Sequence, residues 1–129
     1  MPTGVTIKRR LEWIDTDAAG IWHHSTVIRW AEDAEAELHR TLGIVSRTFG
    51  ATPRVNIDFD FGVPLRFDDE VNVTLTVAAM GETSLTYQVS VDRDGETLAA
   101  GKMVAVLIDP TSGAKKPWPD DMRQLLSPS

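Results

Sequence analysis

The feature that most constrains the fold of this chain is one amphipathic helical segment among segments with the period of β-strands. Between about residues 26 and 42, apolar residues recur at spacings of four and three, which places them in one stripe along a helix. Ser25 or His24 is placed to cap the start of this helix, and Gly43 stands where a C-terminal cap belongs. The stripe consists of Val27, Ala31, Ala34, Leu38 and Leu42.

The other patterned segments alternate apolar and polar residues with the period of two that half-buried antiparallel strands show. One strand is expected before the helix, over about Val5 to Trp13, and four strands are expected after it. Asp94-Gly95 predicts a tight hairpin turn between the last two strands. The later strands are expected over residues 55–61, 71–77, 85–91 and 98–108.

The balance of one long helix against five strands predicts an α+β fold, with the helix packed on a curved antiparallel sheet. One helix and one sheet are not expected to bury every large apolar side chain, such as Trp22 and Trp30. We therefore expect a second subunit to cover them, in a homo-oligomer. The tail from Thr111 contains three prolines and is expected to be a loop on the surface.

Length, composition and charge narrow the class of protein. With 129 residues, the chain is expected to form one domain over residues 1–129. It contains no cysteine, which excludes disulfides, thiolate nucleophiles and cysteine-ligated zinc. The net charge is -6 and the basic residues are scattered, so nucleic acid is not expected as a partner. No apolar run suits a membrane span and no signal-peptide pattern opens the chain, so we expect a cytoplasmic protein without membrane association.

The stretch with the most chemistry runs from Asp15 to His24, just before the expected helix. It holds two carboxylates and two histidines within ten residues. The start of a helix has unpaired backbone N–H groups and a positive dipole end, and it can therefore stabilise an oxyanion. A carboxylate beside it can act as nucleophile or as general base. These are the two parts that a thioester hydrolase needs.

Metal binding is an alternative interpretation of this stretch. The spacing Asp-x-Asp-x-x-Gly also opens a calcium loop, but Ala19 and Thr26 stand where that loop needs an oxygen ligand and a glutamate. Zinc would require His23 and His24 to share one ion, although neighbouring histidines point in different directions. We therefore expect no metal and no cofactor.

Two further interpretations do not involve a metal. A triad of Ser25, His24 and an aspartate would need a nucleophile-elbow pattern, which the sequence lacks. Alternatively, Asp15 and Asp17 only order a turn, as aspartate commonly does. The residues alone leave this structural role open beside the catalytic one.

A longer pattern favours the catalytic role. It stands here as Trp13-Ile14-Asp15-Thr16-Asp17-Ala18-Ala19-Gly20, then Ile21-Trp22-His23-His24, then Arg29-Trp30-Ala31-Glu32. This pattern resembles the 4-hydroxybenzoyl-CoA thioesterase family. The similarity continues in Val63–Glu70, Met80–Leu85 and Asp109–Gly113, in the order of the family, and it covers nearly the whole chain.

The resemblance implies a hotdog fold, in which a five-stranded antiparallel sheet wraps around one long helix. It implies hydrolysis of an acyl-CoA, or of an acyl carrier protein thioester, to the free acid. Asp17 would be the catalytic carboxylate, as nucleophile or general base. The backbone N–H of about His24 would polarise the thioester carbonyl, with a supporting role for the imidazole. The functional unit would be a homodimer or homotetramer with active sites at the subunit interface.

Some details and alternatives stay open within this resemblance. Val27 stands where relatives commonly carry an aromatic residue, and the turn 81–83 lacks the basic residues with which some relatives hold CoA phosphates. A hotdog protein that binds an acyl ligand without turnover, or a hotdog dehydratase or hydratase, is the alternative function. Further substrate contacts are expected from Gly20, Trp22, His23, Ser25, Thr83 and Ser84.

Overall fold

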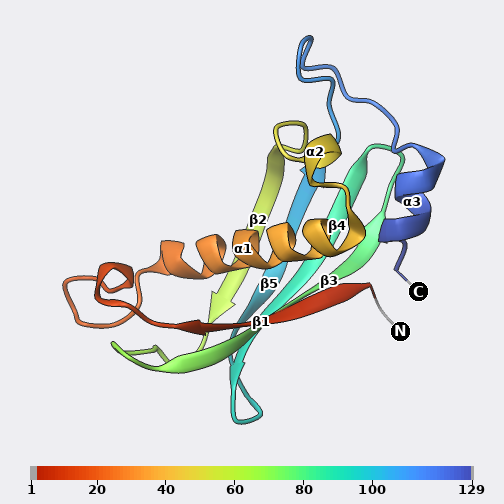
Figure 1. Ribbon diagram of the computed structural model, residues 1–129. Helices are drawn as coiled ribbons and strands as arrows, with labels where there is room; N and C mark the ends of the chain where they lie inside the picture. Colours follow the sequence, from red (N-terminus) through yellow and green to blue (C-terminus); the bar gives the residue numbers. More distant parts are fainter. Residues whose placement is uncertain (1–2, 129) are drawn as a thin grey trace.

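The computed structural model describes residues 3–128, which form an antiparallel sheet with helix α1 (His24–Leu42) along one face (Figure 1). The order of the strands across the sheet is β1-β3-β4-β5-β2. Every neighbouring pair in this order is antiparallel. The strands are β1 (Gly4–Arg10), β2 (Arg54–Phe61), β3 (Glu70–Met80), β4 (Ser84–Arg93) and β5 (Glu96–Val106).

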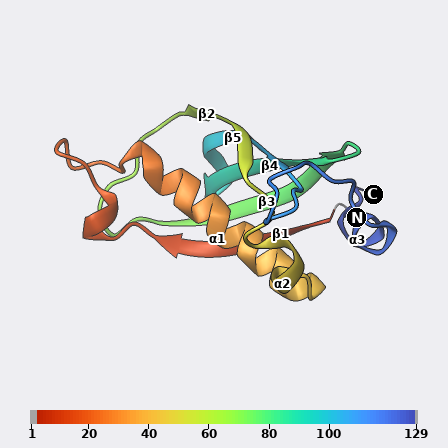
Figure 2. The same ribbon diagram turned by 90° about the horizontal axis from the view of Figure 1, so that it is seen from above.

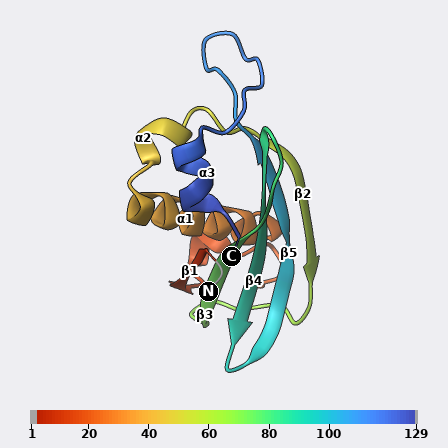
Figure 3. The ribbon, with the colours of Figure 1, turned by 90° about the vertical axis from the view of Figure 1, so that its right-hand side faces the viewer.

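The predicted helical stripe forms the centre of the core. Val27, Ala31 and Ala34 are fully buried, and Leu38 is nearly so. Figures 2 and 3 show α1 lying along the inner face of the curved sheet, where it contacts β1 and β3. The sheet contributes Val73, Leu75, Leu85, Tyr87 and Val89 to the same core. This arrangement confirms the α+β class and the hotdog plan of a sheet wrapped around one long helix.

The local turn and cap signals are confirmed in part. Asp94 and Gly95 both adopt positive φ, at 51° and 82°, as the tight turn between β4 and β5 requires. Gly43 ends α1 in the left-handed conformation. At the other end, however, α1 begins at His24 and its cap is His23, so the prediction of Ser25 or His24 as the cap is wrong.

The first strand ends at Arg10, earlier than its sequence pattern predicts. The carboxylate of Asp15 accepts a hydrogen bond from the Glu12 N–H at 2.9 Å, and the chain turns there into the short 3-10 helix η1 (Trp13–Asp15). Leu11 still reaches the core, but the side chain of Trp13 is 82% exposed. A local side-chain hydrogen bond therefore overrides the alternation that predicted Trp13 on the buried face.

Strand β2 lies at the edge of the sheet, and its apolar face is uncovered within one chain. Val55, Ile57 and Phe61 are 57%, 42% and 44% exposed, although their alternation predicts a half-buried strand. The reason is the position of the strand, because α1 packs over β1 and β3 at the opposite side of the sheet.

The tail is partly helical, which corrects the expectation of a surface loop. Helix α3 (Asp120–Leu126) buries Met122 and Leu126, which are one helical turn apart. Trp118 is also buried, and its indole N–H donates to the Thr83 carbonyl at 3.1 Å. Residues 111–117 are exposed, as the expected loop would be, and the chain is buried again at Trp118.

Within the core, His39 links α1 to the short helix α2 (Val45–Thr48) and to β4. Its Nδ1 lies 2.6 Å from the Thr48 hydroxyl, and its Nε2 lies 2.8 Å from the Tyr87 hydroxyl. Burial lowers the pKa of His39 to about 4, and Arg54, which is paired with the buried Glu35, adds to this effect. His39 is thus a structural residue, and it is neutral near pH 7. It does not supply the positive charge that its place near the end of α1 suggests.

The neutral state of His39 predicts a loss of stability in acid. Between pH 6.5 and about 4, the unfolded chain binds a proton at this imidazole and the folded chain does not. The free energy of unfolding is therefore expected to fall over this window by up to about 3 kcal/mol from this group. Denaturant unfolding at several pH values should show a shallower pH dependence for His39→Gln than for the wild type. An equally steep dependence would contradict this assignment, and His24→Gln at an exposed position is the matched control.

Candidate active site

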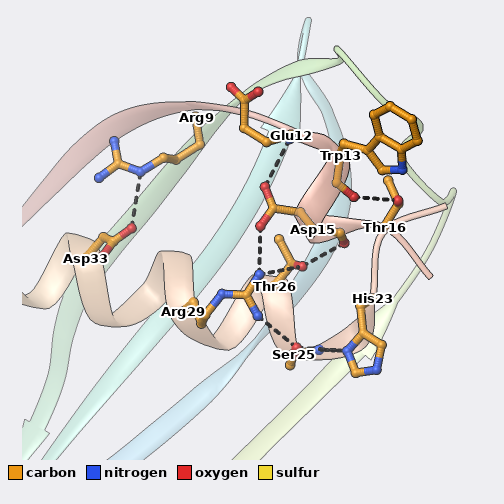
Figure 4. A network of polar contacts seen from close by, with 10 residues as sticks. All are labelled: Arg9, Glu12, Trp13, Asp15, Thr16, His23, Ser25, Thr26, Arg29 and Asp33. Atoms are coloured by element: carbon orange, nitrogen blue, oxygen red, sulfur yellow. Dashed lines mark hydrogen bonds and ion pairs between the residues drawn. The ribbon is translucent and has the colours of Figure 1, made fainter. Parts of the chain in front are cut away.

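Asp15 fastens the loop before α1 to the helix itself. Its carboxylate accepts from the Arg29 guanidinium at 2.7 Å and from the Glu12 N–H at 2.9 Å (Figure 4). Its carbonyl accepts from the His23 N–H at 2.7 Å and from the Thr26 hydroxyl at 2.9 Å. Asp15 is buried, so these contacts are shielded from water and fix both the loop and the first turn of α1.

Asp17 begins a tight turn at the tip of the same loop. Its N–H donates to the Ile21 carbonyl at 2.7 Å, and its carbonyl accepts from the Gly20 N–H at 3.0 Å. Gly20 adopts a φ of +79°, a backbone conformation that residues with a side chain rarely adopt. One carboxylate oxygen of Asp17 accepts from the Ala19 N–H at 2.8 Å. Within residues 3–128 no group hydrogen-bonds to the other oxygen, so it is available for chemistry.

The first turn of α1 presents one open backbone N–H. The Ser25 N–H donates to the His23 imidazole at 3.1 Å, and the Thr26 N–H donates to the His23 carbonyl at 2.9 Å. Across the described residues, the His24 N–H makes no hydrogen bond. The helix dipole adds a positive potential at this point. His24 is therefore the residue whose amide can receive an external oxygen atom.

Asp17 and His24 line one pocket of about 310 Å³. Trp22 forms a buried wall, and Phe61 at the end of β2 meets it edge to face with ring centroids 5.9 Å apart. The pocket thus places a carboxylate and an open helix start beside an aromatic surface. Its lining is Asp17, Ile21, Trp22, His24, Phe61, Gly62 and Pro64.

The structure brings together some of the predicted site residues and separates others. Asp17, Trp22 and His24 share the pocket. Gly20 shapes the turn below it, while His23 and Ser25 form a polar network with Arg29 beside it. Thr83 and Ser84 lie at the β3–β4 turn, at the opposite end of the molecule from the loop (Figures 1 and 2). Their contact with substrate stays a prediction, as do the contacts expected from Gly20, His23 and Ser25.

Sequence patterns did not identify every residue of the pocket. Phe61 ends β2, and Gly62 and Pro64 follow it. These residues are distant from the loop in the sequence, and no local signal connects them to it. Arg29 stood in the quoted motif, and its spacing of four from Ser25 could have indicated their contact on one helix face. Among residues 3–128, no group of three or more metal-ligating side chains is placed to hold an ion.

Comparisons with known proteins agree with the fold and the pocket. Residues 11–126 match the model of the thioesterase-like superfamily. A 1,4-dihydroxy-2-naphthoyl-CoA hydrolase of Prochlorococcus marinus is 30% identical over 105 residues, covering 72% of this chain and 68% of its own. Another protein of that name, from Rippkaea orientalis, is 30% identical over 126 residues, covering 92% and 91%. The structure of a predicted thioesterase from Bacillus stearothermophilus is 25% identical, with a TM-score of 0.86 and coverage of 95% and 93%.

The chain belongs to the thioesterase-like superfamily. The predicted family, the hotdog fold and the class of thioester hydrolase are thereby confirmed. No helix within residues 3–128 is long and apolar enough to cross a membrane.

The different surroundings of the two loop aspartates predict different effects on stability. Asp15→Ala removes charge-assisted hydrogen bonds at a buried site, and the free energy of unfolding should fall by about 2 kcal/mol. Asp17→Ala, at the partly exposed tip, should change it by less than about 0.5 kcal/mol. Denaturant unfolding of both variants measures the difference. Equal losses would contradict the structural role of Asp15.

Proposed function

We propose that this protein hydrolyses acyl-CoA thioesters in the pocket beside the start of α1, with Asp17 as its catalytic carboxylate. The observation that carries the proposal is that Asp17 and His24 line the same pocket, where the N–H of His24 is the open amide of the helix start. This pairing meets the need of thioester hydrolysis for an attacking group and for an acceptor of negative charge.

The chemistry proceeds through attack at the thioester carbonyl. As general base, Asp17 takes a proton from the attacking water. As nucleophile, its carboxylate forms a mixed anhydride, the thiolate of CoA leaves and takes up a proton, and water then releases the acid. On either route the carbonyl oxygen gains negative charge. The His24 N–H can stabilise that oxygen, and one such donor is worth about 3 kcal/mol in known enzymes.

The pocket walls favour an aromatic acyl group. Trp22 and Phe61 present an aromatic surface next to Asp17, and aromatic rings stack or meet edge to face on such surfaces. Two similar proteins are named for a substrate of this class, 1,4-dihydroxy-2-naphthoyl-CoA. We therefore place aromatic CoA thioesters first among the substrates of this chain. A thioester on acyl carrier protein is the alternative.

Asp17→Asn should lose at least about a hundredfold in kcat with little change in KM, because it removes the attacking or proton-accepting charge. The measurement is thiol release from a panel of aromatic and aliphatic acyl-CoAs. His24→Ala keeps the backbone N–H and should lose less. Wild-type activity in Asp17→Asn would leave the aspartate with a turn-forming role only. Ligand binding without thiol release in the folded wild type would favour the non-catalytic alternative.

We further infer that two copies of the chain associate through the β2 edge. An edge strand presents unpaired backbone groups, and here it also exposes Val55, Ile57 and Phe61. A second β2 can supply both the backbone partners and the apolar cover. Phe61 also lines the pocket, so this interface would border the proposed active site. The cytoplasmic location expected from the sequence stays a prediction.

Sedimentation at micromolar protein concentration tests the association. The wild type is expected to sediment as a dimer or tetramer. Ile57→Glu places a charge on the exposed edge and should shift the protein toward monomer. Leu125→Glu, at a comparably exposed apolar position on α3, is the matched control and should not. A monomeric wild type would overturn the proposal.

A further inference from the structure

The geometry points to His23 as a positioning residue of the active site, whose neutral imidazole decides which N–H of helix α1 is open to the substrate. This inference rests on the proposed function, because the open N–H is the one assigned to the thioester oxygen. His23 does not line the pocket. It acts through two contacts, the cap of α1 and a stacked contact with the ring of His24.

The hydrogen bonds around His23 define its protonation state. The Ser25 N–H donates to Nδ1 at 3.1 Å, so Nδ1 carries no proton and the neutral ring holds its proton on Nε2. The Ser25 hydroxyl lies 2.8 Å from Nδ1 and accepts from the Arg29 guanidinium at 2.9 Å (Figure 4). The hydroxyl therefore donates to Nδ1. The network has one direction, from Arg29 through Ser25 to His23.

The cap selects the open amide. The side chain of His23 accepts a hydrogen bond from the Ser25 N–H, and its carbonyl accepts one from the Thr26 N–H. Of these first three N–H groups, only that of His24 is then open. Without the imidazole acceptor, the Ser25 N–H would also seek a partner, and the first turn of α1 would be free to shift. Because the rings of His23 and His24 pack together with centroids 4.1 Å apart, such a shift would also move His24, which lines the pocket with Asp17.

An imidazole cap differs from the usual serine, threonine, aspartate or asparagine cap in its response to pH. A protonated imidazole has no acceptor at Nδ1, and histidine gains its proton at about pH 6.5 in model peptides. The charged and titratable groups around His23 include Arg29, His24 and Asp15. Arg29 is linked to His23 through the Ser25 hydroxyl, and the ring of His24 packs against the ring of His23. The carboxylate of Asp15 accepts hydrogen bonds from Arg29 and from the Glu12 N–H.

Protonation of His23 would remove the acceptor at Nδ1, open the cap and slow turnover. The loss would appear in kcat, because the His24 N–H serves the transition state. It would affect KM much less, since the aromatic walls of the pocket hold the substrate in both states.

Two substitutions of His23 separate the cap from the ring contact. His23→Asn keeps a capping acceptor that does not titrate, and its kcat at about pH 8 should stay within about twofold of the wild type. His23→Phe keeps a ring against His24 and removes the acceptor. At about pH 8, where the wild-type cap is closed, its kcat should fall about fivefold, the equivalent of the usual cap contribution of about 1 kcal/mol. Circular dichroism and denaturant unfolding verify that both variants are folded.

The pH profile of kcat is the readout that a merely structural role would not move. If protonation of His23 opens the cap, the wild type should lose kcat on acidification through this group, and His23→Asn, which cannot be protonated there, should lack this acid limb. His24→Gln, whatever its remaining rate, should retain it. The inference is overturned if His23→Asn keeps the acid limb, or if His23→Phe equals the wild type at about pH 8.

A measurement on the wild type needs no variant and no substrate. Nitrogen NMR of the histidine side chains at about pH 8 should show His23 with an unprotonated Nδ1 and a protonated Nε2. A proton on Nδ1 would overturn the inference. The tautomer is independent of catalysis, so an inactive protein with the expected tautomer would refute only the proposed function. If Asp17→Asn loses activity as expected but His23 carries its proton on Nδ1, only the role of His23 would be refuted.

Discussion

The contacts of Asp15 hold the loop before α1 and the long helix in one arrangement. Its carboxylate engages Arg29, which lies on the helix, and its carbonyl receives the N–H of His23, the residue that caps that helix. Charge-assisted hydrogen bonds at a buried position are strong because water does not compete for them. The side chain of Asp17, at the tip of the loop, is held by a hydrogen bond within its own turn, from the Ala19 N–H. The placement of Asp17 in the pocket therefore follows from the neighbour two positions earlier.

The fold was largely predictable because its main signals are local. The stripe from Val27 to Leu38 and the Asp94-Gly95 turn each depend on residues close in sequence, and both are present in the structure. Periodicity identifies residues that share a face, but it does not say whether anything covers that face. Val55 and Ile57 on β2 are exposed for this reason. In the tail, a segment that was expected to be exposed is buried. Its prolines suggested a loop, although Met122 and Leu126 have the spacing of one helical turn.

The pocket residues that belong to one short motif were predictable from the sequence. The pocket residues that come from a distant part of the chain were not. Asp17, Trp22 and His24 come from one loop and do share the pocket. Phe61 reaches the pocket because Trp22 and Ile21 bond to the segment that follows β2, and these pairings are not encoded in any short pattern. Likewise, nothing in the spacing showed that an imidazole would cap the helix. That role depends on the hydroxyl of Ser25 and on the guanidinium beyond it.

The topology of the sheet also implies an order of assembly. Strands β3, β4 and β5 are joined by tight turns and can pair as soon as they are made, because closing a short loop has a small entropic penalty. In contrast, β1 and β2 pair with strands far away in the sequence, Gly4 opposite Thr76 and Arg54 opposite Ala105. Contacts of this kind form slowly. The pocket is built from the loop after β1 and the segment after β2, so the parts that carry the chemistry come together only after the rest of the sheet has formed a template for them.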